Sequence, residues 1–402
     1  MKNGNFKKLI SSLAIVATAA LTACGGGGGG GGGSAASPAG TAGPTALTPT
    51  VVVTPLVTGT VTGTVSTAVV TTTPTSVVMP PVISTTPTVV VTPPVISTKP
   101  AYTLANPPGA SYPFGTAQRQ MFDTLNQIRI GGGFSALEQD ARLDQAAKAH
   151  ADYGITNYYP DGVGSAQLSV VTPDGWFTAH TELLGVDGFT GARPANRVAM
   201  TGYQAVTTGE VISYKFGQKP GLEPDMSICL SLLLNSVFHR AALLDTSYLD
   251  IGIGISKPVT DKNGFILRQC VIDFAAKQAA PVLPQGWFGI YPFDAQTNAQ
   301  LAMGPERPDP IVSAPVKGGP ISIQTASRQN LLVTSFVLRD ASGLAVNSKV
   351  LTRTDSTFLR TNEAYLVPIR SLAANSSYFV TFSGTSNGTL INKSWTFRTA
   401  VN

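Results

Sequence analysis

The residues of this 402-residue chain best suited to chemistry are its three histidines, His150, His180 and His239. An imidazole near neutral pH can transfer a proton, ligate a metal ion or hydrogen-bond inside a core. His239 lies toward the end of a helix expected over 225–240. On a continuous helix its side chain falls opposite the apolar stripe that contains Leu233. This placement indicates a cleft or a second surface for His239.

Each helical histidine also has a structural interpretation. His150 lies on the apolar face of the segment over 136–157, which is typical of a hydrogen-bonded core histidine. For His239 the alternative is a position at a helix C-terminus beside Arg240, where an imidazolium gains about 0.3 to 1 kcal/mol from the helix dipole. The sequence leaves both alternatives open.

The N-terminal residues have the pattern of a secretory signal. Lys2, Lys7 and Lys8 precede an apolar run and a small-residue cleavage site, and Cys24 follows. Residues 1–23 resemble a bacterial lipoprotein signal, which implies acylation of Cys24 and a membrane partner held through the acyl chains. Residues 24–112, rich in Gly, Thr, Pro and Val, are expected to form a disordered tether.

Net charge and cysteine content restrict the possible partners of the chain and its compartment. The net charge of +5 falls to +2 when the three signal lysines are removed, which argues against a nucleic-acid partner. Once Cys24 carries lipid, Cys229 and Cys270 remain, and an oxidising compartment favours a disulfide between them. Such a bond closes a loop of about 40 residues and contributes roughly 3 to 4 kcal/mol if unstrained.

Periodicity predicts an α+β domain over 113–278. Apolar spacing and capping residues indicate helices, and β-forming runs flank the turn residues Asn263 and Gly264. The expected helices cover 116–130, 136–157, 194–202 and 225–240, and the expected strands cover 251–256 and 265–275. This order favours helices layered on an antiparallel sheet.

Residues 285–400 are expected to form an all-β sandwich. Alternation of period two indicates strands over 331–340, 376–384 and 394–399. The last two strands, joined through Asn387 and Gly388, resemble the closing hairpin of bacterial immunoglobulin-like domains. The G-x-S-x-G pattern at 384–388 therefore predicts a turn and not a nucleophile elbow.

Seven segments of the region 113–278 resemble the CAP superfamily, the SCP-like extracellular domain, in their order and spacing. They are LNQIR, LDQAAKAHA, AHTE, PANRVAMTGY, GEVISY, NSVFHRAALLD and IGIGI. The resemblance implies an α-β-α sandwich with a central antiparallel sheet. It also implies a shallow cleft lined by two histidines and acidic residues.

Carried over to this sequence, the resemblance implies a cleft formed by His180, Glu210 and His239. Two imidazoles and a carboxylate suit a zinc or other divalent ion, with His180 and His239 as ligands, and they equally suit proton transfer. No W-x-x-E segment precedes His239, so the second glutamate of the family's tetrad has no counterpart. Glu182 is a nearby candidate for this second glutamate, although no family motif marks it.

Two functions from different classes follow. The first is an extracytoplasmic lipoprotein, anchored to the bacterial outer membrane or cell surface, whose cleft binds a lipid, glycan or envelope component. The alternative is a hydrolase of peptide, ester or cell-wall bonds that uses the same cleft. A structural envelope protein with a vestigial cleft is a third possibility. Whether the chain is an enzyme stays open from the sequence.

Overall fold

The computed structural model describes residues 109–159 and 178–401. The predicted signal, Cys24 and the predicted tether as far as residue 108 lie outside the described residues. The end of that tether is wrong, because Tyr112 is buried in the core and accepts a hydrogen bond from the backbone N–H of Ile253. Within them the chain contains both helices and several largely antiparallel sheets, as expected for the α+β class. No helix in these two ranges is both long and apolar enough to cross a membrane.

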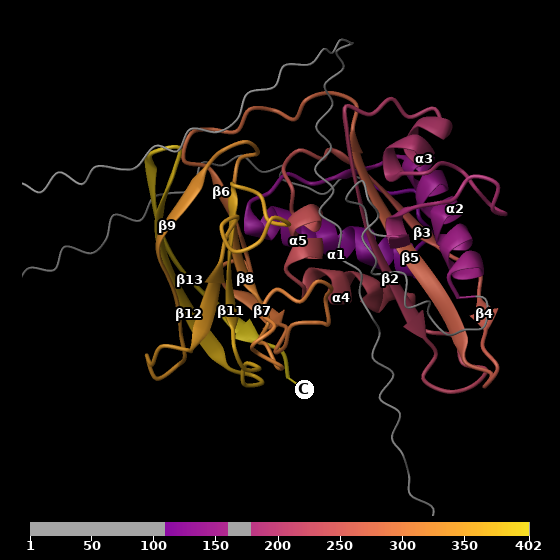
Figure 1. Cartoon of the computed structure of the whole chain (residues 1–402). Coiled ribbons are helices and arrows are strands. Elements are labelled where there is room, and N and C mark those ends of the chain that lie inside the picture. The colour runs from indigo at the N-terminus through magenta and orange to yellow at the C-terminus, as the bar shows by residue number, and fades with distance from the viewer. Residues whose placement is uncertain (1–108, 160–177, 402) are drawn as a thin grey trace, which may run out of the picture. The chain divides into compact units, whose positions relative to one another are not determined.

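The first half of the described chain forms a β-sheet with helices packed against it (Figure 1). Its helices are α1 (Ala117–Gly132), α2 (Ala141–Asn157), α3 (Pro194–Met200), α4 (Cys229–Leu234) and α5 (Phe238–Leu243), with short 3-10 turns η2 (Thr178–His180) and η3 (Met226–Ile228). Its strands are β1 (Glu138–Gln139), β2 (Thr207–Phe216), β3 (Asp250–Ile255), β4 (Val259–Thr260) and β5 (Ile266–Ala276). Four of them lie in the order β1-β3-β5-β2, and β4 pairs with β5.

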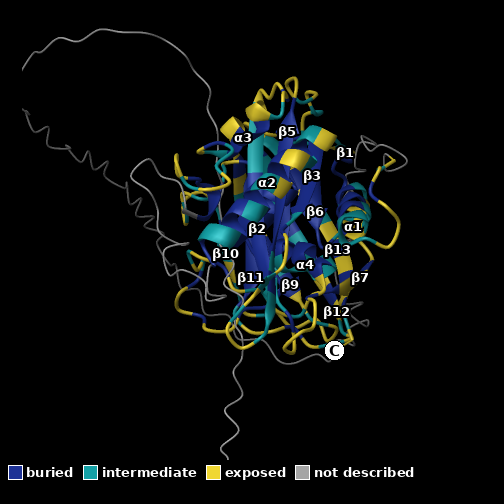
Figure 2. Ribbon diagram, turned by 90° about the vertical axis from the view of Figure 1, so that its right-hand side faces the viewer, coloured by how far each residue is buried: buried dark blue, intermediate teal, exposed yellow. Residues whose placement is uncertain are grey.

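Both faces of this sheet are covered by helices, because alternate residues of its strands enter different cores. Val211 of β2 packs with α1 and α4, whereas its neighbour Ile212 packs with α2. The glycines of the IGIGI run allow α2 to approach β3 closely: a Cβ added at Gly252 would lie 2.1 Å from the Leu143 carbonyl carbon. Figure 2 shows the resulting buried residues along β2, β3 and β5.

The expected helix over 225–240 is wrong in one respect: the chain there is broken into η3, α4 and α5. The break falls at residues 235–237, before the short helix that carries His239. The direction predicted for His239 depended on an unbroken helix and is therefore wrong. In the structure His239 is fully buried.

The second half contains two four-stranded sheets. Their strands are β6 (Phe288–Tyr291), β7 (Gln296–Ala299), β8 (Ile321–Thr325), β9 (Leu331–Arg339), β10 (Ser348–Leu351), β11 (Glu363–Pro368), β12 (Ser377–Ser386) and β13 (Thr389–Thr399). The sheet orders are β10-β11-β8-β6 and β7-β13-β12-β9. As predicted, Asn387 and Gly388 form the turn between β12 and β13, both with positive φ. The pattern at 384–388 is therefore a hairpin end.

Apolar packing is continuous between the two halves. Trp287 and Tyr291 belong to the same cluster as α1, and Phe238 of α5 packs with Tyr365 of β11. Arg129 of α1 also donates hydrogen bonds to the Leu243 and Asp245 carbonyl oxygens, which fixes the end of α5. The segment around α5 is thus held from both sides.

The predicted disulfide is present. Cys229 at the start of α4 is bonded to Cys270 of β5, 41 residues further along the chain. Both residues are fully buried, so the bond joins helix to sheet inside the core.

Candidate functional site

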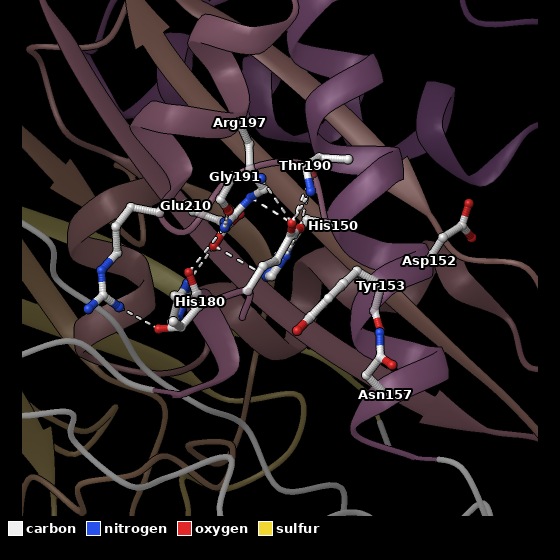
Figure 3. A network of polar contacts seen from close by, with 12 residues as sticks. His150, Asp152, Tyr153, Asn157, His180, Thr190, Gly191, Arg197 and Glu210 are labelled. Atoms are coloured by element: carbon white, nitrogen blue, oxygen red, sulfur yellow. Dashed lines mark hydrogen bonds and ion pairs between the residues drawn. The ribbon is translucent and has the colours of Figure 1, made fainter. Parts of the chain in front are cut away.

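Two of the three residues predicted to share a cleft are in direct contact. His180 Nδ1 lies 2.7 Å from Glu210 Oε1, and both side chains are buried (Figure 3). His180 ends η2, and Glu210 lies on the face of β2 that also carries Ile212 toward α2. The pair thus joins a connecting segment to the central sheet.

Arg197 of α3 holds this pair in place. Its Nη2 donates to Glu210 Oε2 over 2.6 Å, and its Nη1 donates to the His180 carbonyl oxygen over 3.2 Å. Arg197 and Glu210 are each at least 96% buried, since their relative exposures are 1% and 4%. The guanidinium supplies the opposite charge that a buried carboxylate requires. Nothing in the sequence pattern had marked Arg197.

His150 joins the same network, as a structural histidine. Its Nδ1 lies 2.9 Å from Glu182 Oε1, and its Nε2 lies 2.9 Å from the Ala179 carbonyl oxygen. Both partners are acceptors, so both ring nitrogens of His150 are engaged. Glu182 also accepts hydrogen bonds from the backbone N–H groups of Thr190 and Gly191. Glu182 therefore braces His150 and the following loop.

His180 differs from His150 in having one ring nitrogen without a hydrogen-bond partner. Its buried Nε2 contacts no donor or acceptor within hydrogen-bonding distance among the described residues. Burial lowers the pKa of His180, and the hydrogen bond to Glu210 acts in the opposite direction. A neutral ring with its proton on Nδ1, donated to Glu210, leaves the Nε2 lone pair as an acceptor.

A second carboxyl group lies beside Glu210. Asp273 of β5 is paired with Glu210 in the β2–β5 register, is fully buried, and has no hydrogen-bond partner for either oxygen among the described residues. Burial raises the pKa of Asp273 well above its ordinary value, and the nearby charge of Glu210 raises it further, while Arg197 opposes the shift. The pKa of Glu210, by contrast, is lowered, because Arg197 and the two histidines outweigh the effect of burial. Of the two carboxyl groups, Asp273 therefore has the higher pKa.

His239 belongs to a different set of contacts. Its Nδ1 lies 3.0 Å from Glu306 Oε1 and 2.9 Å from Ser236 Oγ. Within the described ranges it forms no hydrogen bond or ion pair with His180 or Glu210. Glu306, which follows β7, was not anticipated from the sequence.

The donor set provides a partial fit to a metal ion. In both predicted ligands, Nδ1 is held by a carboxylate, which is the usual outer-shell partner of a metal-binding histidine. The Glu210 oxygens, however, are engaged by His180 and Arg197. Across residues 109–159 and 178–401, no group of three or more His, Cys, Asp or Glu is arranged to hold a metal ion. Zinc binding by His180 and His239 stays a prediction.

Comparisons with known proteins add little to this geometry. No protein-family model matches the chain, and a search of curated proteins finds no match. Among solved structures, an outer surface protein from Borrelia burgdorferi is 18% identical and aligns over 42% of this chain and 100% of its own, with a TM-score of 0.27. A TM-score of that size does not establish a shared fold.

Proposed function

We propose that this chain is an extracytoplasmic binding protein, anchored through a lipid on Cys24, whose CAP-type domain takes up its ligand at His180. In this proposal residues 113–278 form the CAP-type domain and residues 285–400 an immunoglobulin-like sandwich. The buried Cys229–Cys270 disulfide supports an oxidising compartment. The three-layer arrangement of α2, the sheet and α1 supports the domain type.

The observation that carries the proposal is the Nε2 atom of His180. A buried ring nitrogen without a hydrogen bond is unfavourable, by about 1 to 3 kcal/mol for a typical buried polar group. A ligand hydroxyl, amide or ammonium group that donates to this nitrogen would recover that free energy. Glu210 and Arg197 fix the ring, so the acceptor is oriented before the ligand arrives.

Hydrolysis is the second candidate, and the same pair of residues favours it. A neutral imidazole whose Nδ1 donates to a carboxylate is the arrangement of a general base. Here Nε2 would accept a proton from water or a hydroxyl, and Glu210 would stabilise the resulting imidazolium. A zinc ion on His180 and His239 would add Lewis-acid polarisation of a carbonyl group.

A ligand screen with matched variants tests the proposal. The mature chain, its His180→Ala variant and the exposed control Gln145→Ala are each mixed with bacterial phospholipid vesicles, soluble peptidoglycan fragments and p-nitrophenyl esters. We expect one probe to raise the melting temperature of the wild type and the control but not of His180→Ala. Ester turnover that disappears only in His180→Ala would favour the hydrolase.

Equal responses of the three proteins to every probe would contradict a role for His180. The third possibility, a structural envelope protein with a vestigial cleft, would then gain support.

A further inference from the structure

A groove of about 400 Å³ lies apart from the His180 site. It is lined by residues of α1, of α4 and of the segment that runs from β6 through β7. We call it the amide groove and define it by six of its side chains. These are Thr124, Gln127, Asn235, Thr297, Asn298 and Gln300.

The lining of the amide groove carries no charged side chain. Its polar groups are amides and hydroxyls, contributed by both halves of the chain. These side chains offer no opposite charge with which an ionic ligand could pair. The groove therefore selects for an uncharged ligand.

Some polar side chains that line the groove are engaged within the protein: Ser231 donates to the Ile228 carbonyl oxygen, and Gln296 accepts from the backbone N–H of Phe293. The six defining side chains differ from these two. None of the six forms a hydrogen bond to another described residue, even though Asn235 is only 8% exposed. Each amide offers donors and acceptors together, and each hydroxyl does the same. A ligand that presents many hydroxyl groups at close spacing matches this set.

An aromatic ring also lines the groove. Phe293 is partly exposed, and a Cβ added at Gly131 of α1 would lie 3.0 Å from its ring. The ring is thus held against the end of α1 and offers the groove an apolar face. Pockets for small molecules combine such apolar faces with a few oriented polar groups. The C–H face of a sugar ring is complementary to this combination.

A peptide that adds a strand to the sheet beside β7 fits this groove less well than a sugar does. β7 lies at the end of its sheet, but Asn298 has a φ of 63° and the pairing of β7 with β13 shifts register between Phe397 and Thr399. A peptide that extends a sheet needs a regular edge for its main-chain hydrogen bonds. Recognition here depends on side chains instead.

From these observations we infer that the amide groove binds an uncharged oligosaccharide. The groove shares no lining residue with His180, Glu210 or Arg197, so the activity is independent of the function proposed above. The proposed sugar site is formed where the two halves of the chain meet.

The test measures binding of maltotetraose and chitotetraose to the mature chain by titration calorimetry, with tetragalacturonate and tetra-alanine as charged and peptide comparators. The double variant Thr124→Ala/Gln127→Ala removes two exposed groove side chains from α1, where alanine preserves the helix. Gln145→Ala, an exposed glutamine of α2 outside the groove, is the matched control.

We expect at least one neutral sugar to bind the wild type and Gln145→Ala, with affinity about tenfold lower in the double variant, which corresponds to about 1.4 kcal/mol. His180→Ala should bind the sugar as the wild type does, which separates this site from the first. Failure of both sugars to bind, equal affinity in the double variant, or preference for either comparator would overturn the inference.

Discussion

Glu306 Oε1 lies 3.0 Å from His239 Nδ1, so a carboxylate from the second half of the chain orients a histidine of the first half. The same carboxylate accepts the backbone N–H groups of Val237, Phe238 and His239, at 2.8, 2.7 and 3.1 Å. Glu306 therefore caps α5 and positions its histidine at once. Glu210 makes the corresponding contact with His180.

Replacing Glu306 by alanine should destabilise the protein by roughly 2 to 4 kcal/mol, because several buried donors lose their acceptor together. Urea unfolding of the mature chain measures the effect. Glu223→Ala is the control, since Glu223 forms only an exposed pair with Arg268, and its loss should change stability by less than about 1 kcal/mol. Similar losses in the two variants would show that Glu306 does not have this capping role.

Removing the disulfide should also lower stability. The pair Cys229→Ala/Cys270→Ala releases a loop closed over 41 residues, and we expect the free energy of unfolding to fall by about 2 to 4 kcal/mol. The wild type unfolded in the presence of a reductant should approach the same value. If reduction left the unfolding midpoint unchanged, the bond would have no stabilising role.

Replacing Asp273 by asparagine should stabilise the protein at neutral pH by roughly 1 to 3 kcal/mol. The folded-state pKa of Asp273 is raised above its ordinary value of 3.8, so its contribution to stability is fully present below that pH and is lost as pH rises toward the folded-state pKa. Asparagine resembles the protonated acid and does not titrate.

The advantage of Asp273→Asn over the wild type should therefore grow between about pH 4 and pH 7 in urea unfolding. Asp187→Asn, at an exposed loop position, serves as the control and should show no such trend. A difference that stays constant or shrinks with rising pH would mean that Asp273 is ionised in the folded protein.

Zinc titration of the mature chain tests the predicted metal site. If His180 and His239 share an ion, alanine at either position should weaken binding by at least about tenfold, and Glu306→Gln, which alters the outer shell, should weaken it by about 10-fold to 100-fold. His150 is not a predicted ligand, and both of its ring nitrogens are already engaged. Affinities that are unchanged in both single histidine variants would exclude the shared site.

Local patterns were sufficient for much of the fold. The apolar periodicity of α1 and α2 and the alternation along β12 and β13 are properties of neighbouring residues, and the structure confirms these elements. The break between α4 and α5 could not be found in this way. The Glu306 carboxylate that caps α5 comes from 67 residues beyond His239.

For the same reason, only part of the candidate site could be predicted from the sequence. His180 and Glu210 were found through family-like segments, whereas Arg197 and Asp273 reach Glu210 only through helix docking and strand pairing. One signal was available for Asp273, a carboxylate inside the otherwise apolar run VIDFAA, since such residues are almost never fully buried without a special role.

The protonation state of His180 tests the central claim most directly. Nitrogen-15 NMR of the mature chain at about pH 7, with His180→Gln to assign the signals, distinguishes the two ring nitrogens. We expect a neutral ring with the proton on Nδ1, donated to Glu210, and an unprotonated Nε2 that can accept a hydrogen bond from a ligand. A proton on Nε2 at that pH would contradict the claim that this atom is the binding group.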